Sequence, residues 1–266
     1  MDRIKIAEKY LNQLYGDTRA PLKETDPEFS AIKERLIYGE IYDEEKLSPR
    51  LRELIILVVA ATNQTMSEVR WHTRAALSCG VSAVEIKEAI YHCAPYIGLG
   101  KAEATAEVVN QVLTELDITL PLPSQAVAED RRLTSGIAAQ KSIFGNSIDT
   151  MRAAASDNQK NIQDYLSAYC FGDFYTRTVL DIPTRELLTF VILATLGGCE
   201  SQLKAHVGGN VAVGNEKDTL LAALTICLPY IGFPRTLNAL ACVNEMIPEI
   251  SMRTAARTLG RKSKHG

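Results

Sequence analysis

The sequence predicts an all-α protein that consists of two tandem copies of one helical unit. Apolar residues recur with the period of an α-helix, and the strict alternation typical of β-strands is scarce. Short motifs return after 133 or 134 residues, which indicates an internal duplication. Capping residues and glycines divide each copy into five or six helices.

The duplication is visible in a shared register. Arg-Glu-Leu at 52–54 recurs at 185–187, an offset of 133 residues. His72 matches His206 at an offset of 134, so the second copy has gained one residue before its histidine. This register predicts four segments: a first unit over 1–117, a linker over 118–132, a second unit over 133–252 and a basic tail over 253–266.

Capping signals predict where helices begin and end. Ser82 and Glu85 have the spacing of a capping box, in which side chains and backbone bond reciprocally at a helix N-terminus. Thr65 and Glu68 have the same spacing. Gly80 lies between the two pairs and predicts the end of the helix that starts after Thr65.

Composition and charge limit the class of partner. The formal net charge of -3 offers no field to hold a polyanion, so we expect no nucleic-acid partner. The apolar runs 54–61 and 187–196 are far shorter than the roughly 20 residues of a membrane-spanning helix, and they predict buried core helices. The N-terminus shows no secretory signal, so we expect a cytoplasmic protein without a membrane partner. The six cysteines have no metal-binding spacing, and we expect no metal site.

Glu68 and His72 form the candidate catalytic pair. They are four residues apart, so a helix places the carboxylate and the imidazole on one face. Such a pair can pass a proton, because the carboxylate orients the ring and raises its basicity. Two alternatives stay open at this point. Glu68 could close a capping box with Thr65, and His72 could be a hydrogen-bonded core residue.

The second copy keeps the histidine and changes its neighbour. Gln202 precedes His206 by four residues, and Cys199 precedes it by seven. His206, Cys199 and Gln202 are therefore the second-copy candidates. Glutamine cannot shuttle a proton at neutral pH, so two sites, if both exist, would differ chemically.

Pro-Tyr-Ile-Gly segments at 95–98 and 229–232 predict a helix break in each copy. The tyrosine of each segment and the basic residue at the start of the helix that follows are the candidate substrate-binding residues: Tyr96, Lys101, Tyr230 and Arg235. A helix N-terminus with a nearby cation favours a carboxylate, so we expect a small anionic substrate. Tyr96 would help line the pocket at His72, and Lys101 would hold a second carboxylate. The alternative is that the tyrosines are core residues and the cations are solvated.

The sequence resembles the carboxymuconolactone decarboxylase family, whose superfamily also contains the AhpD alkylhydroperoxidases. In the first copy the resemblance rests on Arg52-Glu53-Leu54, Glu68-x-x-x-His72, Ala75-Ala76, Gly80-Val81-Ser82, Glu85-Ile86 and Tyr96-Ile97-Gly98. In the second copy it rests on Arg185-Glu186-Leu187, His206, Gly214 and Tyr230-Ile231-Gly232. The resemblance implies the all-helical AhpD-like fold and a homo-oligomer, for a tandem chain a trimer.

The resemblance implies a decarboxylase more than a peroxidase. The peroxidase branch carries Cys-x-x-Cys-x-x-x-His, whereas Thr65 and Glu68 occupy the cysteine positions here, and Cys199 and Gln202 occupy them in the second copy. The expected function is decarboxylation of a small carboxylated lactone or related acid through a Glu68–His72 relay. No cofactor is expected, because the unsaturated ring accepts the electrons. A thiol-dependent peroxidase and a non-catalytic oligomeric binding protein are the alternatives.

Overall fold

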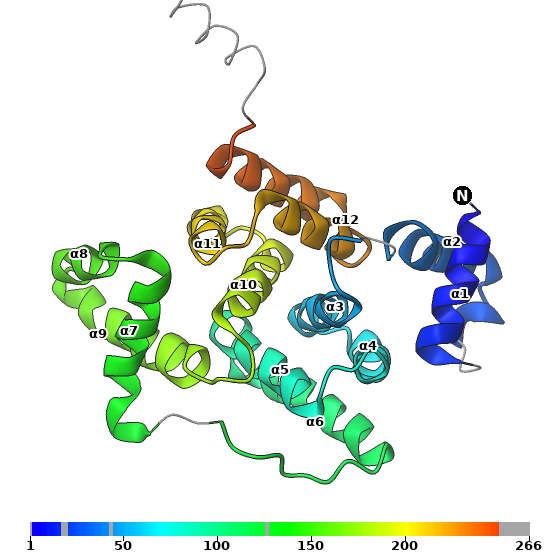
Figure 1. Cartoon of the computed structure of the whole chain (residues 1–266), viewed down its shortest axis with the longest axis horizontal. Helices are drawn as coiled ribbons and strands as arrows, with labels where there is room; N and C mark the ends of the chain where they lie inside the picture. The colour runs from blue at the N-terminus through cyan, green and yellow to red at the C-terminus, as the bar shows by residue number, and fades with distance from the viewer. Residues whose placement is uncertain (1, 17–20, 43–44, 126–127, 250–266) are drawn as a thin grey trace, which may run out of the picture.

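The computed structural model describes residues 2–16, 21–42, 45–125 and 128–249, and these residues form helices and no strand (Figure 1). The predicted all-α class is therefore confirmed. The first unit contains α1 (Arg3–Tyr15), η1 (Pro21–Lys23), α2 (Pro27–Leu36), the π-helical segment η2 (Ile37–Ile41), α3 (Pro49–Asn63), α4 (Met66–Ser78), α5 (Ala83–Ile97) and α6 (Leu99–Glu115). The second unit contains η3 (Glu129–Arg131), α7 (Arg132–Phe144), α8 (Ser147–Ala154), α9 (Asp157–Tyr165), the π-helical segment η4 (Leu166–Tyr175), α10 (Ile182–Leu196), α11 (Glu200–Ala212) and α12 (Lys217–Met246).

The helix order repeats between the units. Helices α3 and α4 correspond to α10 and α11, and the pair α5 and α6 corresponds to α12. Gly98 separates α5 from α6 with a φ of 89°, and Gly232 bends α12 at the equivalent point with a φ of 76°. The predicted breaks therefore fall on the glycines, while Pro95 and Pro229 lie inside the helices that precede them.

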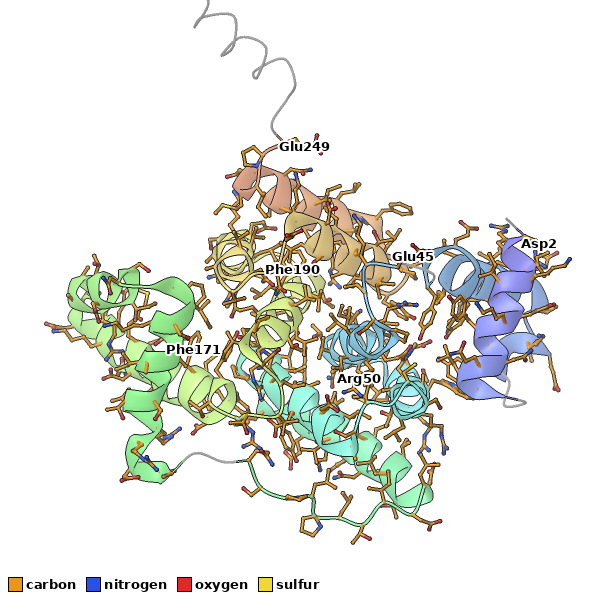
Figure 2. All side chains as sticks on the ribbon, viewed as in Figure 1. Asp2, Glu45, Arg50, Phe171, Phe190 and Glu249 are labelled. Carbon is orange, nitrogen blue, oxygen red and sulfur yellow. The ribbon has the colours of Figure 1, made fainter. Side chains whose placement is uncertain are left out.

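The two central helices, α3 and α10, pack against each other and carry the apolar runs predicted as core. Both runs are buried, and Phe190 of α10 lies in the middle of the molecule (Figure 2). Helix α5 packs against α10 as well as α3, and α12 packs against α3 as well as α10. Helices α5 and α12 therefore each pack on the central helix of the other unit, and buried residues of both units form one core.

The N-terminal helices of the two units lie on opposite sides of this core (Figure 1). Helix α1 packs on η2, and α7 packs on η4. Gly39 and Gly172 allow this close approach, because a Cβ at either position would overlap a backbone carbonyl oxygen of the opposing helix. Arg3 pairs with Glu40 in the first unit, and Arg132 pairs with Asp173 at the equivalent place.

Helix α12 has the length and composition of a membrane-spanning helix. It is divided at Gly232, and it packs against α3, α10 and α11. The cytoplasmic location stays a prediction.

The segment between α6 and α7 overlaps the expected linker. Helix α6 ends at Glu115, before the expected linker over 118–132, and the last residues of that segment form η3 and the first residue of α7, Arg132. The expected basic tail over 253–266 lies outside the described residues. The predicted capping box of Ser82 and Glu85 is formed, and α4 ends just before Gly80 as expected.

Gly39→Ala is expected to destabilise the protein by about 1–3 kcal/mol, because the new methyl group would collide with the Arg3 carbonyl oxygen. Gly100→Ala is the matched control, since a Cβ there meets nothing within 4 Å and alanine favours a helix over glycine. Denaturant unfolding of both variants measures the difference. Equal stability of the two would contradict the close packing of α1 on η2.

Candidate functional site

His72 lies in a buried hydrogen-bonded cluster of the first unit. Its Nδ1 is 2.8 Å from Oε2 of Glu53, and neither side chain has exposed surface. The Tyr42 hydroxyl donates a hydrogen bond to the other Glu53 oxygen at 2.6 Å. A carboxylate on Nδ1 fixes the ring orientation and leaves Nε2 as the nitrogen available for chemistry.

The neighbouring arginine holds this cluster in place. Arg52, beside Glu53 on α3, donates to the backbone carbonyls of Tyr42 and Leu47. Its guanidinium also lies 4.6 Å from the centre of the Tyr42 ring. These contacts fix the segment between η2 and α3, so that the Tyr42 hydroxyl reaches Glu53.

Two groups face Nε2 of His72. Oε2 of Glu68 is 3.6 Å away, and the Tyr230 hydroxyl is 3.3 Å away. The other Glu68 oxygen pairs with Nζ of Lys33 from α2 at 2.5 Å. Thr65 forms no side-chain cap on α4, and its hydroxyl bonds to the Ala60 carbonyl instead. The capping-box interpretation of Glu68 is therefore wrong, since its carboxylate is directed to His72 and Lys33.

The charged groups of the cluster shift the pKa values of His72 and Glu68. Burial lowers the pKa of His72, but the charge and hydrogen bond of Glu53, with those of Glu68, outweigh burial and raise the pKa to about 9. Burial raises the pKa of Glu68, but His72 and Lys33 outweigh it and lower the pKa to about 2. At neutral pH, His72 is therefore a charged acid beside an ionised carboxylate.

A cavity of about 630 Å³ lies between α1, α2 and α4. Glu68 and Lys33 line it, together with the aromatic side chains of Tyr15, Tyr38 and Trp71. The Tyr15 and Tyr38 hydroxyls are 2.9 Å apart. His72 has no exposed surface, whereas Glu68 both lines the cavity and contacts Nε2 of His72. Glu68 therefore stands between His72 and the cavity.

Each of the two predicted tyrosines lies at the histidine centre of the opposite copy. Tyr230 of the second copy contacts His72. Tyr96 of the first copy contacts the second-copy centre, where its hydroxyl is 3.2 Å from that of Tyr175. The expectation that Tyr96 lines the pocket at His72 is wrong, because α5 and α12 each pack on the central helix of the opposite unit.

The two predicted cations lie away from the cluster. Lys101 is exposed near the start of α6, outside the lining of the cavity. Arg235 is exposed on α12, and its Nη1 donates to Oδ1 of Asn63 at 3.3 Å. Lys33 is the cation that pairs with Glu68. It could not be found from the duplication, because the equivalent residue of the second copy is Leu166.

The second copy repeats the inner part of the centre. Nδ1 of His206 is 2.9 Å from Oε2 of Glu186, and Tyr175 donates to the other Glu186 oxygen at 2.7 Å. The recurrence of Tyr42 as Tyr175 and of Glu53 as Glu186, both at an offset of 133, was the sequence signal for these residues.

The outer part of the second centre has a different chemistry. The polar and aromatic residues around the first-copy cavity have less polar or smaller counterparts at the offsets of 133 and 134: Leu166 for Lys33, Phe171 for Tyr38, Gln202 for Glu68 and Ala205 for Trp71. Phe144, the last residue of α7, stands where Tyr15, the last residue of α1, stands in the first copy. The Phe144 ring lies 5.5 Å from the His206 ring, centre to centre. Gln202 is exposed, and its side-chain oxygen accepts a hydrogen bond from the Ser201 hydroxyl. His206 therefore keeps its carboxylate partner, while the charged groups on its outer side are gone.

Cys199 lacks the features of a reactive thiol. Burial, with the nearby Glu200 charge, raises its pKa, and its Sγ contacts the Leu193 carbonyl oxygen at 3.4 Å. A peroxide-reactive cysteine needs the opposite shift. All six cysteines are free. Across the described parts of the chain, no three His, Cys, Asp or Glu side chains gather into a group that could hold a metal ion.

Comparisons with known proteins agree with this architecture. The carboxymuconolactone decarboxylase family model matches residues 27–111 and 160–245, one segment in each copy. The 4-carboxymuconolactone decarboxylase of Acinetobacter baylyi is 28% identical over 113 residues, which are 42% of this chain and 81% of that protein. A crystal structure from Burkholderia xenovorans LB400, described as a gamma-carboxymuconolactone decarboxylase subunit, has a TM-score of 0.53 at 21% identity and covers 91% of this chain and 96% of its own. That likeness shows the fold, and the predicted family and tandem organisation are confirmed.

Stability is expected to fall as the pH rises from about 6.5 to about 9. The folded-state pKa of His72 exceeds its ordinary value of 6.5, so the folded protein holds a proton that the unfolded chain releases. This contribution, on the order of 3 kcal/mol, is complete below the ordinary value and is lost as the pH passes the folded-state value. Denaturant unfolding at pH values across this window measures it. His72→Gln should flatten the dependence, and an unchanged slope in that variant would count against the shifted pKa.

Proposed function

Because the chain belongs to the carboxymuconolactone decarboxylase family, we propose that its first-copy centre is a cofactor-free decarboxylase of a small carboxylated lactone or related acid. The observation that carries the proposal is the Glu68–His72 pair at the edge of the cavity, with 3.6 Å between Oε2 and Nε2. The name of the Acinetobacter baylyi relative describes a reaction of this class.

The reaction requires an electron sink and a proton. When the substrate carboxylate leaves as CO₂, the electron pair of the broken C–C bond moves through the ring double bond onto the lactone carbonyl and forms a dienolate. A ring carbon of the dienolate then takes up a proton. The protein must therefore supply a hydrogen-bond donor for the dienolate oxygen and an acid for the carbon.

His72 and Glu68 supply the proton in this proposal. His72 is charged at neutral pH, and Glu68 links it to the cavity. The proton passes from Nε2 of His72 to the Glu68 carboxylate and from there to the ring carbon. Protonated Glu68 is a high-energy species, because the pKa of Glu68 lies far below that of His72, and uptake of the proton by the basic dienolate carbon draws the transfer forward. Glu68 is 20% exposed, so solvent can return a proton to the pair after each cycle.

The cavity wall suits a flat unsaturated acid. Tyr15, Tyr38 and Trp71 provide aromatic surface for the ring, and Lys33 provides a positive charge for a carboxylate. Burial raises the pKa of Tyr38, so its phenol stays protonated and can donate to a developing oxyanion.

A homotrimer and a cytoplasmic location are part of the proposal. Exposed apolar side chains at equivalent places on α2 and α9 support an oligomer: Phe29 and Ile32, and Ile162 and Tyr165. Apolar surface of this kind marks contact sites between proteins.

Equivalent substitutions at the two histidines test the proposal. His72→Gln is expected to lower kcat for CO₂ release from carboxymuconolactone by at least about 100-fold, because glutamine can bond to Glu53 but cannot deliver a proton. His206→Gln is the matched substitution in the second copy, and we expect it to keep most of the activity. Helicity and unfolding of both variants control for damage to the fold.

Three outcomes would contradict parts of this account. A wild-type protein that releases no CO₂ from the lactone would favour a non-catalytic binding protein. Equal loss in both variants would place an active centre in each copy. Full activity in His72→Gln would remove the relay.

A further inference from the structure

We propose that Tyr230, which the second copy contributes to the first-copy centre, is a positioning residue that stabilises the neutral form of His72. The catalytic consequence of this inference rests on the proposed function, whereas the effect on His72 itself does not. The relay requires His72 to alternate between a charged and a neutral ring, so a group that supports the neutral ring supports the whole cycle.

The position of Tyr230 is fixed by both units. Its hydroxyl lies 3.3 Å from Nε2 of His72, and the two rings meet edge to face at 5.8 Å between centres. Its backbone carbonyl accepts a hydrogen bond at 3.0 Å from Asn63, the last residue of α3. The Gly232 bend follows two residues later. The second copy therefore presents this phenol to the histidine of the first.

The two partners of Nε2 favour different forms of the ring. The Glu68 carboxylate can only accept a hydrogen bond, so it stabilises the charged ring. The Tyr230 hydroxyl can accept from the charged ring, and it can also donate to the lone pair of the neutral ring. Nδ1 bonds to Glu53 in both forms. Tyr230 is thus the donor that the described residues offer to the neutral ring at Nε2.

The remaining charged and titratable groups around His72 are already engaged. Glu53 on α3 holds Nδ1 and accepts from Tyr42, and Glu68 on α4 is paired with Lys33 on α2. Loss of the Tyr230 hydroxyl would leave a buried lone pair on neutral His72 without a donor, which is costly. The charged ring would still have Glu68. The pKa of His72 should therefore rise.

The equivalent tyrosine does not make this contact. The Tyr96 hydroxyl is 3.0 Å from Oγ1 of Thr189 and 3.2 Å from the Tyr175 hydroxyl. Residue 56, the counterpart of Thr189 at the offset of 133, is isoleucine and has no hydroxyl. The first copy therefore leaves Tyr230 free for its histidine, whereas the second copy engages Tyr96 elsewhere.

Tyr230→Phe and Tyr96→Phe form a matched pair for the test. Each removes one hydroxyl from an equivalent position and keeps the ring. The readout is the titration of the His72 side chain by NMR between about pH 6 and pH 11, with the His72 signals assigned by their absence in His72→Gln. We expect Tyr230→Phe to raise the midpoint of His72 by about one pH unit and Tyr96→Phe to leave it unchanged. With the lactone as substrate, Tyr230→Phe should lower kcat about tenfold with little change in KM.

The NMR result decides the inference whether or not the protein acts on the lactone. An unchanged or lowered His72 midpoint in Tyr230→Phe would overturn it, and so would an equal shift in Tyr96→Phe. A raised midpoint in a protein inactive on the lactone would support the inference and count against the proposed function. A loss of activity with no change in the titration would assign Tyr230 a purely structural role and overturn the inference.

Discussion

The buried pair of Glu53 and His72 is the interaction on which the first-copy centre depends. Removing a carboxylate and an imidazole from water is costly, and a partner lost from such a pair leaves a buried charge that costs about 3–5 kcal/mol. The 2.8 Å contact and the Tyr42 hydrogen bond offset this cost, and they fix α4 against α3. The same arrangement recurs with Glu186 and His206, so the pair belongs to the fold in both copies. The groups outside the pair decide whether a copy can do chemistry.

The duplication allows the two copies to specialise. The first copy has Glu68 and Lys33 on the cavity side of its histidine, and the second has Phe144 close to its histidine. Because α5 and α12 pack on the opposite central helix, neither copy is complete without the other. The second copy can therefore lose the charged groups of its own centre and still contribute Tyr230 to the first.

Local signals predicted the parts of the structure that depend on near neighbours. The capping box at Ser82 and the meeting of Glu68 with His72 follow from spacing along one helix. The exchange of Tyr96 and Tyr230 could not be predicted in this way, because it depends on how helices far apart in sequence cross. Lys33 was missed for the same reason, since α2 reaches Glu68 only through tertiary packing. Glu53 stood in a motif repeated in both copies, and that repetition was a usable signal.

A crystal structure with an unreactive substrate analogue tests the central claim most directly. A saturated carboxylated lactone is suitable, because it lacks the ring double bond that accepts electrons. The account predicts one molecule per chain in the cavity between α1, α2 and α4, with a carboxylate on Lys33 and the ring within reach of Glu68. An analogue bound beside His206, or outside the cavity altogether, would contradict it.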